Sequence, residues 1–96
     1  MRFEWDPAKE RLNVRKHGLT FSEAKTLFTS KVDYLEFFDG AHSDTEDRFV
    51  AIGPIRHGLV LVVFTERSGS TIRIISARWA SKKEQALYQQ HLKEQQ

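Results

Sequence analysis

The clearest hydrophobic pattern in the chain lies in its second half. Two runs rich in Val and Ile, residues 59–65 and 71–77, are joined by the polar residues 66–70. β-Branched and aromatic residues on both sides of a short Gly/Ser loop predict a β-hairpin. On an unbroken second strand, alternation puts these side chains on one face: Ile72, Ile74, Ser76 and Arg78. The opposite face would then carry Arg73, Ile75 and Ala77.

The N-terminal part of the chain alternates briefly and then becomes helical. Residues 3–5 alternate and predict a short first strand. Asp6-Pro7 has the form of an N-cap followed by proline, and Gly18 suits a left-handed helix end, so we predict a helix over residues 7–17. A capping box over residues 20–23 opens a second helix. Its apolar face is expected to pack on the sheet and contains Phe21, Ala24, Leu27 and Phe28.

Two more strands and a last helix complete the pattern. Residues 32–38 and 48–55 are predicted strands, and a capping box over residues 81–84 opens a helix whose polar end, residues 90–96, is expected to fray. The order predicts an α+β domain with a short strand, two helices, an antiparallel sheet of about four to five strands and a C-terminal helix. Ninety-six residues with 40% hydrophobic content suffice for one domain over residues 1–96.

Composition excludes some classes of chemistry. The chain has no Cys, so disulfides and thiolate chemistry are impossible. The apolar run at residues 59–65 is far shorter than a membrane span, and the start of the chain lacks the form of a signal peptide. We therefore expect a soluble, cytoplasmic protein with no membrane partner.

Charge is distributed unevenly although the net charge is only +2. Residues 36–47 contain five acidic residues and no Lys or Arg. Residues 48–83 contain seven basic residues and one acidic residue, Glu66. Such a basic region favours a nucleic-acid partner, although a charged run is also typical of an ordinary solvated face. The acidic loop includes His42, Asp44, Glu46 and Asp47, but their spacing fits neither a calcium loop nor a zinc hydrolase site. We expect no metal and no cofactor.

Two arginines lie inside the second strand of the predicted hairpin. Arg73 and Arg78 interrupt a run that otherwise belongs to a core. A guanidinium group offers a planar fork of donors that matches a phosphate, which suggests an anion site. Each arginine is equally open to a structural role, with its stem packed on the sheet and its charge paired.

An ordered set of short motifs resembles the BrnT family of bacterial toxins over roughly residues 3–88. The set comprises Phe3-Glu4-Trp5-Asp6, Asn13 with Lys16-His17-Gly18, Phe21 with Glu23-Ala24, Asp39 with His42-Ser43 and Asp47-Arg48-Phe49, Ile52-Gly53, and the run from Ile72 to Arg78. Asp47, where the family pattern has Glu, and Trp79, where a polar residue is more usual, are departures from it.

This resemblance implies a RelE-like fold and a ribonuclease toxin that arrests translation. It also implies a cognate antitoxin with a DNA-binding domain, which forms a hetero-oligomer with the toxin, neutralises it and represses their shared operon. The RNA substrate would be messenger RNA, which the ribosome itself could position.

Metal-independent RNA cleavage needs a base for the 2′-hydroxyl, cations for the phosphate and an acid for the departing 5′-oxygen. Arg73 and Arg78 are the first candidates for holding the phosphate. His17 and Glu66 are candidates for proton transfer, with Tyr88 as a further donor or simply a core aromatic. The cations expected to bind RNA around them are Lys16, Arg67, Lys82 and Lys83.

Two other functions remain open from the sequence. The chain could be a non-catalytic RNA- or DNA-binding module, in which Trp5 and Trp79 serve as stacking platforms. It could also be an interaction protein whose basic surface docks an acidic partner.

Overall fold

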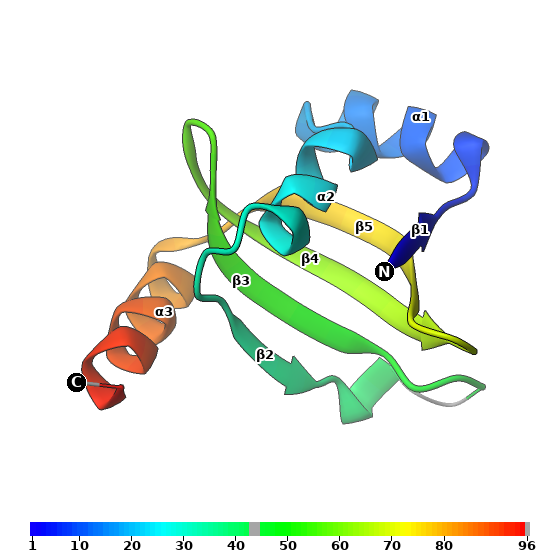
Figure 1. The fold of residues 1–96 in the computed structure, drawn as a ribbon. Helices are drawn as coiled ribbons and strands as arrows, with labels where there is room; N and C mark the ends of the chain where they lie inside the picture. The colour runs from blue at the N-terminus through cyan, green and yellow to red at the C-terminus, as the bar shows by residue number, and fades with distance from the viewer. Residues whose placement is uncertain (43–44, 96) are drawn as a thin grey trace.

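The computed structural model describes residues 1–42 and 45–95, and its elements follow the predicted order (Figure 1). They are β1 (Arg2–Glu4), α1 (Pro7–His17), α2 (Phe21–Thr29), β2 (Leu35–Phe38), the 3₁₀ turn η1 (Gly40–His42), β3 (Phe49–Ile55), β4 (Gly58–Arg67), β5 (Thr71–Trp79) and α3 (Lys82–Glu94). The strand predicted from residue 32 begins three residues later, and both hairpin strands extend by two residues beyond their predicted ends.

The strands form one five-stranded sheet in the order β1-β5-β4-β3-β2. β2, β3, β4 and β5 pair as antiparallel neighbours, whereas β1 pairs with β5 in parallel. The predicted α+β fold is confirmed, and the parallel pair makes the sheet mixed. The first strand of the chain thus reaches the sheet beside the last one.

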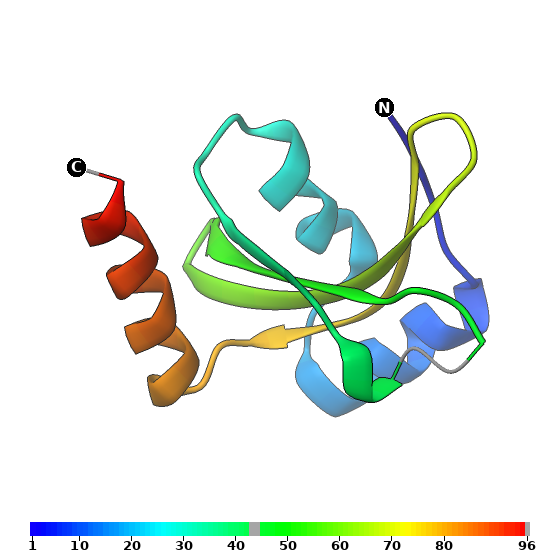
Figure 2. The same cartoon turned by 90° about the horizontal axis from the view of Figure 1, so that it is seen from below.

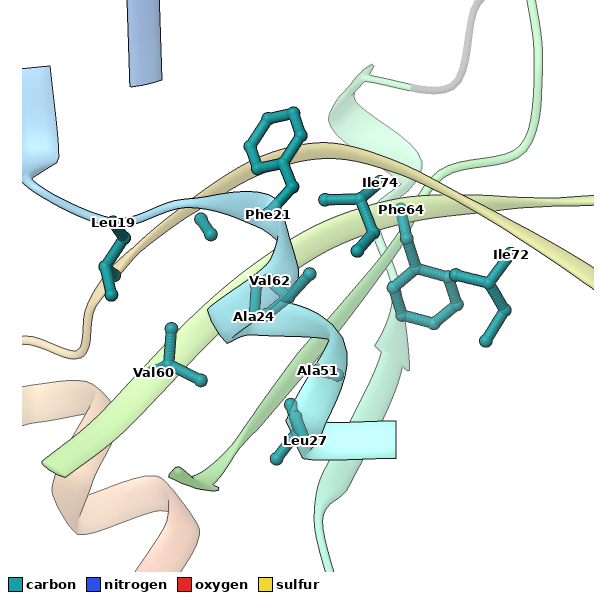
Figure 3. Close-up of a cluster of buried hydrophobic side chains, with 11 residues drawn as sticks. Leu19, Phe21, Ala24, Leu27, Ala51, Val60, Val62, Phe64, Ile72 and Ile74 are labelled. Carbon is teal, nitrogen blue, oxygen red and sulfur yellow. The ribbon is translucent and has the colours of Figure 1, made fainter. Parts of the chain in front are cut away.

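One face of the sheet carries the main core, under α1 and α2 (Figures 1 and 3). The predicted apolar face of α2 is fully buried at Phe21, Ala24 and Leu27. These side chains pack against alternate strand residues that include Val60, Val62, Phe64, Ile72 and Ile74. Both predicted capping boxes form, since Thr20 and Glu23 cap α2 and Ser81 and Glu84 cap α3.

The other face of the sheet is only partly covered. α3 stands apart from α1 and α2 (Figure 2) and covers one end of this face, where Tyr88 and Leu92 pack on a smaller cluster. The strand residues of that cluster are Leu35, Val50, Ile52, Leu59, Leu61 and Val63. The rest of the face lies open beside α3.

Asn13 is the one buried residue of the otherwise wet helix α1. Its side-chain amide donates to the carbonyl of Ala77 at 2.8 Å and accepts from the Ala77 N–H at 3.1 Å. The same amide donates to the carbonyl of Leu19 at 2.9 Å. The pairing of β5 with β1 ends at Arg73. Farther along β5, Asn13 gives Ala77 the two backbone hydrogen bonds that a neighbouring strand would otherwise make.

A bulge in β5 changes which side chains share a face. Val63 pairs with Ser76 but Phe64 pairs with Ile74, so Ile75 is an extra residue on β5. Ala77 consequently joins Ile72 and Ile74 in the main core. The prediction for an unbroken strand, with Ala77 opposite these residues, is wrong from Ser76 onward.

Because of this bulge, Arg73 and Arg78 lie on the same face of the sheet. Arg73 stands opposite Thr65 and Arg78 opposite Leu61, and both partners fall on the strand positions that face away from α1 and α2. The alternation predicted from the sequence would have separated them.

Candidate functional site

A groove of about 420 Å³ lies on the open face of the sheet, beside the start of α3. Its apolar floor is made by Phe37, Val50, Leu61, Val63 and Ile75. Its polar lining is made by Asp39, Arg48, Ser76, Arg78 and Glu84. The groove therefore suits a ligand that combines flat apolar surface with charge.

Arg78 and Glu84 form a two-pronged ion pair on the α3 side of this groove. The two guanidinium Nη atoms of Arg78 donate to the two carboxylate oxygens of Glu84, each at 2.7 Å. The hydrogen bonds from Arg78 lower the pKa of Glu84 from its ordinary 4.5 to about 2, and the capping contact with Ser81 contributes to this. The hydrogen bond to Glu84 likewise raises the pKa of Arg78. Glu84 is thus a firmly ionised carboxylate that orients Arg78.

The position of Glu84 follows from the local sequence. It is the third residue of α3, and its Oε1 also accepts from the backbone N–H of Ser81 at 2.8 Å. The capping box that starts α3 therefore also holds Glu84 in place as the partner of Arg78, which lies near the end of β5.

Arg78 keeps donor capacity in spite of this pair. Its contacts with Glu84 and with the carbonyl of Trp79, the latter at 3.3 Å, use three of its five N–H donors among the described residues. The donors left over include the Nε edge of the guanidinium fork, and 40% of the side chain is exposed. The Nε edge can therefore donate hydrogen bonds to an anion bound in the groove.

Arg48 and Asp39 lie in the lining of the same groove. Asp39 directly follows β2 and Arg48 directly precedes β3, and the Asp39 N–H donates to the Arg48 carbonyl at 2.8 Å. Arg48 Nε also lies 4.0 Å from the Glu46 carboxylate. Arg48, just before β3, and Arg78, in β5, thus line one groove.

The other predicted arginines are paired outside the groove lining. Arg73 donates to Glu4 of β1 at 2.6 Å, where the two residues are in register. Arg67 lies 3.7 Å from Glu46. Neither is part of the groove lining, although Arg73 shares its face of the sheet.

The remaining predicted cations lie near helix ends. Lys82 and Lys83 are exposed in the first turn of α3, two and one residues before Glu84. Lys16 is exposed and His17 half-buried in the last turn of α1, a position that the helix dipole also favours. Lys82 and Lys83 are therefore closest along the chain to the groove, and His17 is not in its lining.

Glu66 lies on the opposite face of the sheet from Arg78. It lines a smaller pocket of about 280 Å³ with Tyr34, Glu36, Arg67 and other residues. Burial, and next the charge of Glu66, raise the pKa of Glu36. The structure separates this carboxylate pair from the groove.

Tyr88 occupies the core under α3. Its side chain is 5% exposed, and its hydroxyl donates to the carbonyl of Asp33 at 2.8 Å. Burial, and next the charge of Asp33, raise the pKa of the phenol. This position favours the core-aromatic interpretation of Tyr88.

Sequence reasoning did not propose Arg48, Asp39, Ser76 or Glu84 as site residues. Arg48, Asp39 and Ser76 do belong to the motifs that carry the family resemblance, and the sequence predicts Glu84 only as part of a helix cap. Their proximity to Arg78 depends on strand pairing and on the β5 bulge, neither of which a local pattern reveals.

The predicted acidic loop gives no metal cluster among the described residues. No group of three or more His, Asp or Glu side chains there is arranged to hold an ion. Asp44 and the side chain of His42 lie outside the described residues. Across residues 1–42 and 45–95, no helix is both long and apolar enough to cross a membrane.

Comparison with known proteins agrees with the resemblance found in the sequence. A family model described as the ribonuclease toxin BrnT of type II toxin–antitoxin systems matches residues 5–84. A crystal structure of the Brucella abortus ribonuclease toxin BrnT is 30% identical in sequence, with a TM-score of 0.69, and the match covers 85% of this chain and 99% of that one. None of the curated proteins compared with the chain matches it.

Proposed function

The chain belongs to the BrnT family of ribonuclease toxins of type II toxin–antitoxin systems, and we propose that it inhibits translation by cutting RNA without a metal ion. The 2′-hydroxyl attacks the adjacent phosphate, the bond to the 5′-oxygen breaks, and a 2′,3′-cyclic phosphate remains. The observation that carries this proposal is the groove in which Arg78 is held by Glu84 with its Nε edge open.

Arg78 is proposed to bind the phosphate that is cut. Its fork matches two phosphate oxygens, and the charge that grows on them in the transition state strengthens the contact. Glu84 keeps the guanidinium in place, so little reorganisation accompanies the reaction. Arg48, across the groove, is a second cation for the same phosphate or its neighbour.

The other predicted cations are proposed to hold the RNA backbone. Arg73 lies on the same face as Arg78, and Lys82 and Lys83 are exposed beside the groove. Contacts of this kind fix the register of the RNA but do not read its sequence. Lys16 and Arg67 would extend the contacts beyond the groove.

Proton transfer by His17 or Glu66 stays a prediction. Neither residue lines the groove, so each would need an RNA path that extends past the sheet edge. Tyr88 is a weaker candidate, since its buried hydroxyl donates to the backbone carbonyl of Asp33. We infer that phosphate binding and charge stabilisation by arginine supply most of the catalysis, on RNA that the ribosome positions.

Cleavage of RNA by the purified chain in the presence of EDTA tests the proposal. The wild-type chain should produce ends with 2′,3′-cyclic phosphate, alone or with translating ribosomes. Arg78→Ala should reduce the rate about 100-fold because a donor to the transition state is lost. Arg78→Lys should be intermediate, since it keeps the charge and loses the fork. Arg15→Ala, an exposed arginine of α1 outside the groove, is the matched control.

Three results would contradict parts of the proposal. Intact RNA with folded wild-type chain, with and without ribosomes, would favour a non-catalytic binding module. Loss of cleavage in EDTA that returns with Mg²⁺ would refute metal independence. An unchanged rate for folded Arg78→Ala would place the reaction outside this groove.

A type II family implies an antitoxin partner. We propose that this partner neutralises the nuclease as a hetero-oligomer and carries a DNA-binding domain through which it represses the operon. Growth arrest on expression of the chain alone, relieved by co-expression of the product of the adjacent reading frame, is the expected result.

A further inference from the structure

β2 forms one outer edge of the sheet, since the strand order ends there. The Asp39 N–H donates to the Arg48 carbonyl at 2.8 Å, which makes this pair a hydrogen-bonded one. In an antiparallel ladder such pairs alternate with pairs whose backbone groups point away. Phe37 and Leu35 therefore bond to β3, and the N–H and C=O groups of Glu36 and Phe38 point outward from the sheet.

Large apolar side chains flank these outward groups. Phe37 is 41% exposed and Phe38 53% exposed. Phe37 lies on the groove face, where it is part of the groove lining. Phe38 lies on the other face, where its ring contacts that of Phe49 with centroids 5.7 Å apart. An open edge with apolar groups on both faces offers a template for another strand.

We propose that β2 receives a sixth strand from the antitoxin, paired through the backbone of Glu36 and Phe38. The inference rests on the proposed function, because family membership supplies the antitoxin. The incoming segment is extended, with apolar side chains beside Phe37 and Phe38. It carries Lys or Arg near Glu36, since Glu36 is exposed and shares a small pocket with Glu66.

A second copy of the chain fits this edge less well. β2 contains four residues, so symmetric pairing of two such strands alone would bury far less than the roughly 1,200 Å² of a stable interface. It would also bring two acidic edges together. An antitoxin segment is free to continue beyond the strand and to carry the opposite charge.

Pairing at this edge would also explain neutralisation. The side chain opposite Phe37 on an added strand would lie on the groove face of the sheet. Phe37 and Asp39 already line the groove that holds Arg78. A strand at β2 would therefore cover the groove from its β2 side and hinder RNA without touching Arg78.

Two substitutions at one position test backbone pairing. Glu36→Pro removes the side chain and the outward N–H, whereas Glu36→Ala removes the side chain alone. Proline is tolerated on an edge strand where its N–H would face outward. The affinity of each purified full-length chain for the purified product of the adjacent reading frame is measured by calorimetry. We expect the proline variant to bind at least about tenfold more weakly than the alanine variant, which should lose only a few-fold.

Hydrogen exchange on the same complex provides a second measurement. The amides of Glu36 and Phe38 should exchange rapidly in the chain alone and become protected in the complex, while the amides of Phe37 and Asp39 are protected in both. Equal affinities of the Pro and Ala variants, or no new protection at Glu36 and Phe38, would overturn the inference. So would an antitoxin that fails to bind the wild-type chain, or a Glu36→Pro change that abolishes a toxin dimer and leaves antitoxin affinity intact.

RNA cleavage separates this inference from the proposed function. Glu36 does not line the groove, so both variants should cut RNA at the wild-type rate without antitoxin. Loss of RNA cleavage in the wild-type chain would refute the nuclease, whereas the affinities and amide protection would still decide the strand pairing.

Discussion

The side of β5 that faces away from β4 and the side of β2 that faces away from β3 satisfy their backbone groups in different ways. At one edge, β1 pairs with the first residues of β5, and Asn13 then bonds both backbone groups of Ala77. At the other edge, Glu36 and Phe38 of β2 direct backbone groups away from the sheet. β1 and the Asn13 side chain bond the outer side of β5, which is called the closed edge. The outer side of β2, called the open edge, faces solvent or a partner. The comparison indicates that β5, which carries Arg73 and Arg78, is bonded on its outer side from within the chain, whereas the outer side of β2 is the one proposed to bind a partner.

The closed edge should be the more sensitive to substitution. Asn13→Ala removes the partners of three buried backbone groups, the N–H and C=O of Ala77 and the C=O of Leu19. We expect the free energy of unfolding to fall by about 3 to 4 kcal/mol, because buried groups without partners cost about 1 to 3 kcal/mol each. Urea unfolding measures this loss.

A neighbouring residue of α1 provides the control for that experiment. Leu12 is 59% exposed, so Leu12→Ala should change the unfolding free energy by less than about 0.5 kcal/mol. Similar small losses for Asn13→Ala and Leu12→Ala would show that the closed edge does not depend on the amide.

The ion pair at the end of β5 should give a smaller, pH-dependent effect. The pKa of Glu84 is lowered from 4.5 to about 2 in the folded chain, so the folded state favours the ionised form. Its stabilisation is fully present above about pH 4.5 and is lost as the pH falls toward 2. Glu84→Gln should cost about 1 kcal/mol near pH 6, because solvent screens the half-exposed Arg78.

Unfolding of wild type and Glu84→Gln between pH 2 and pH 6 checks this prediction. The difference between the two chains should shrink as the solution is acidified. A difference that stays constant over this range would mean that the carboxylate charge contributes nothing to stability and that Glu84 acts only as a helix cap.

The open edge should tolerate substitution best. Glu36 is exposed, and Glu36→Thr replaces it with a residue that favours strands. The unfolding free energy should fall by less than about 1 kcal/mol, since little buried area is lost. Thermal unfolding measures the change. A loss as large as that of Asn13→Ala would show that β2 is as firmly built into the fold as β5, and the contrast between the edges would disappear.

The sequence predicts local structure well where a short-range signal exists. Both capping boxes, the proline at the start of α1, Gly18 at its end and the hairpin all form as predicted. Each of these features depends on residues within a few positions of one another, so the local sequence is enough to predict it.

Features that depend on distant contacts were not predicted. Ile75 is a normal strand residue by its type, and nothing near it in the sequence indicates a bulge. Asn13 lies in a polar helix, and its role depends on Ala77, 64 positions away. The groove combines residues of β2, β3, β4, β5 and α3, so its charged lining depends on how distant strands pair.

The contact between Asn13 and Ala77 also affects when the fold can form while the chain is being synthesised. β1 and α1 leave the ribosome early, yet Ala77 of β5 is made 64 residues after Asn13. Contacts between such distant positions form late, because closing the long loop between them costs conformational entropy. On the proposed function, the nascent chain has no assembled groove until β5 has been made and has paired with β1 and α1. Toxicity would then begin no earlier than this pairing.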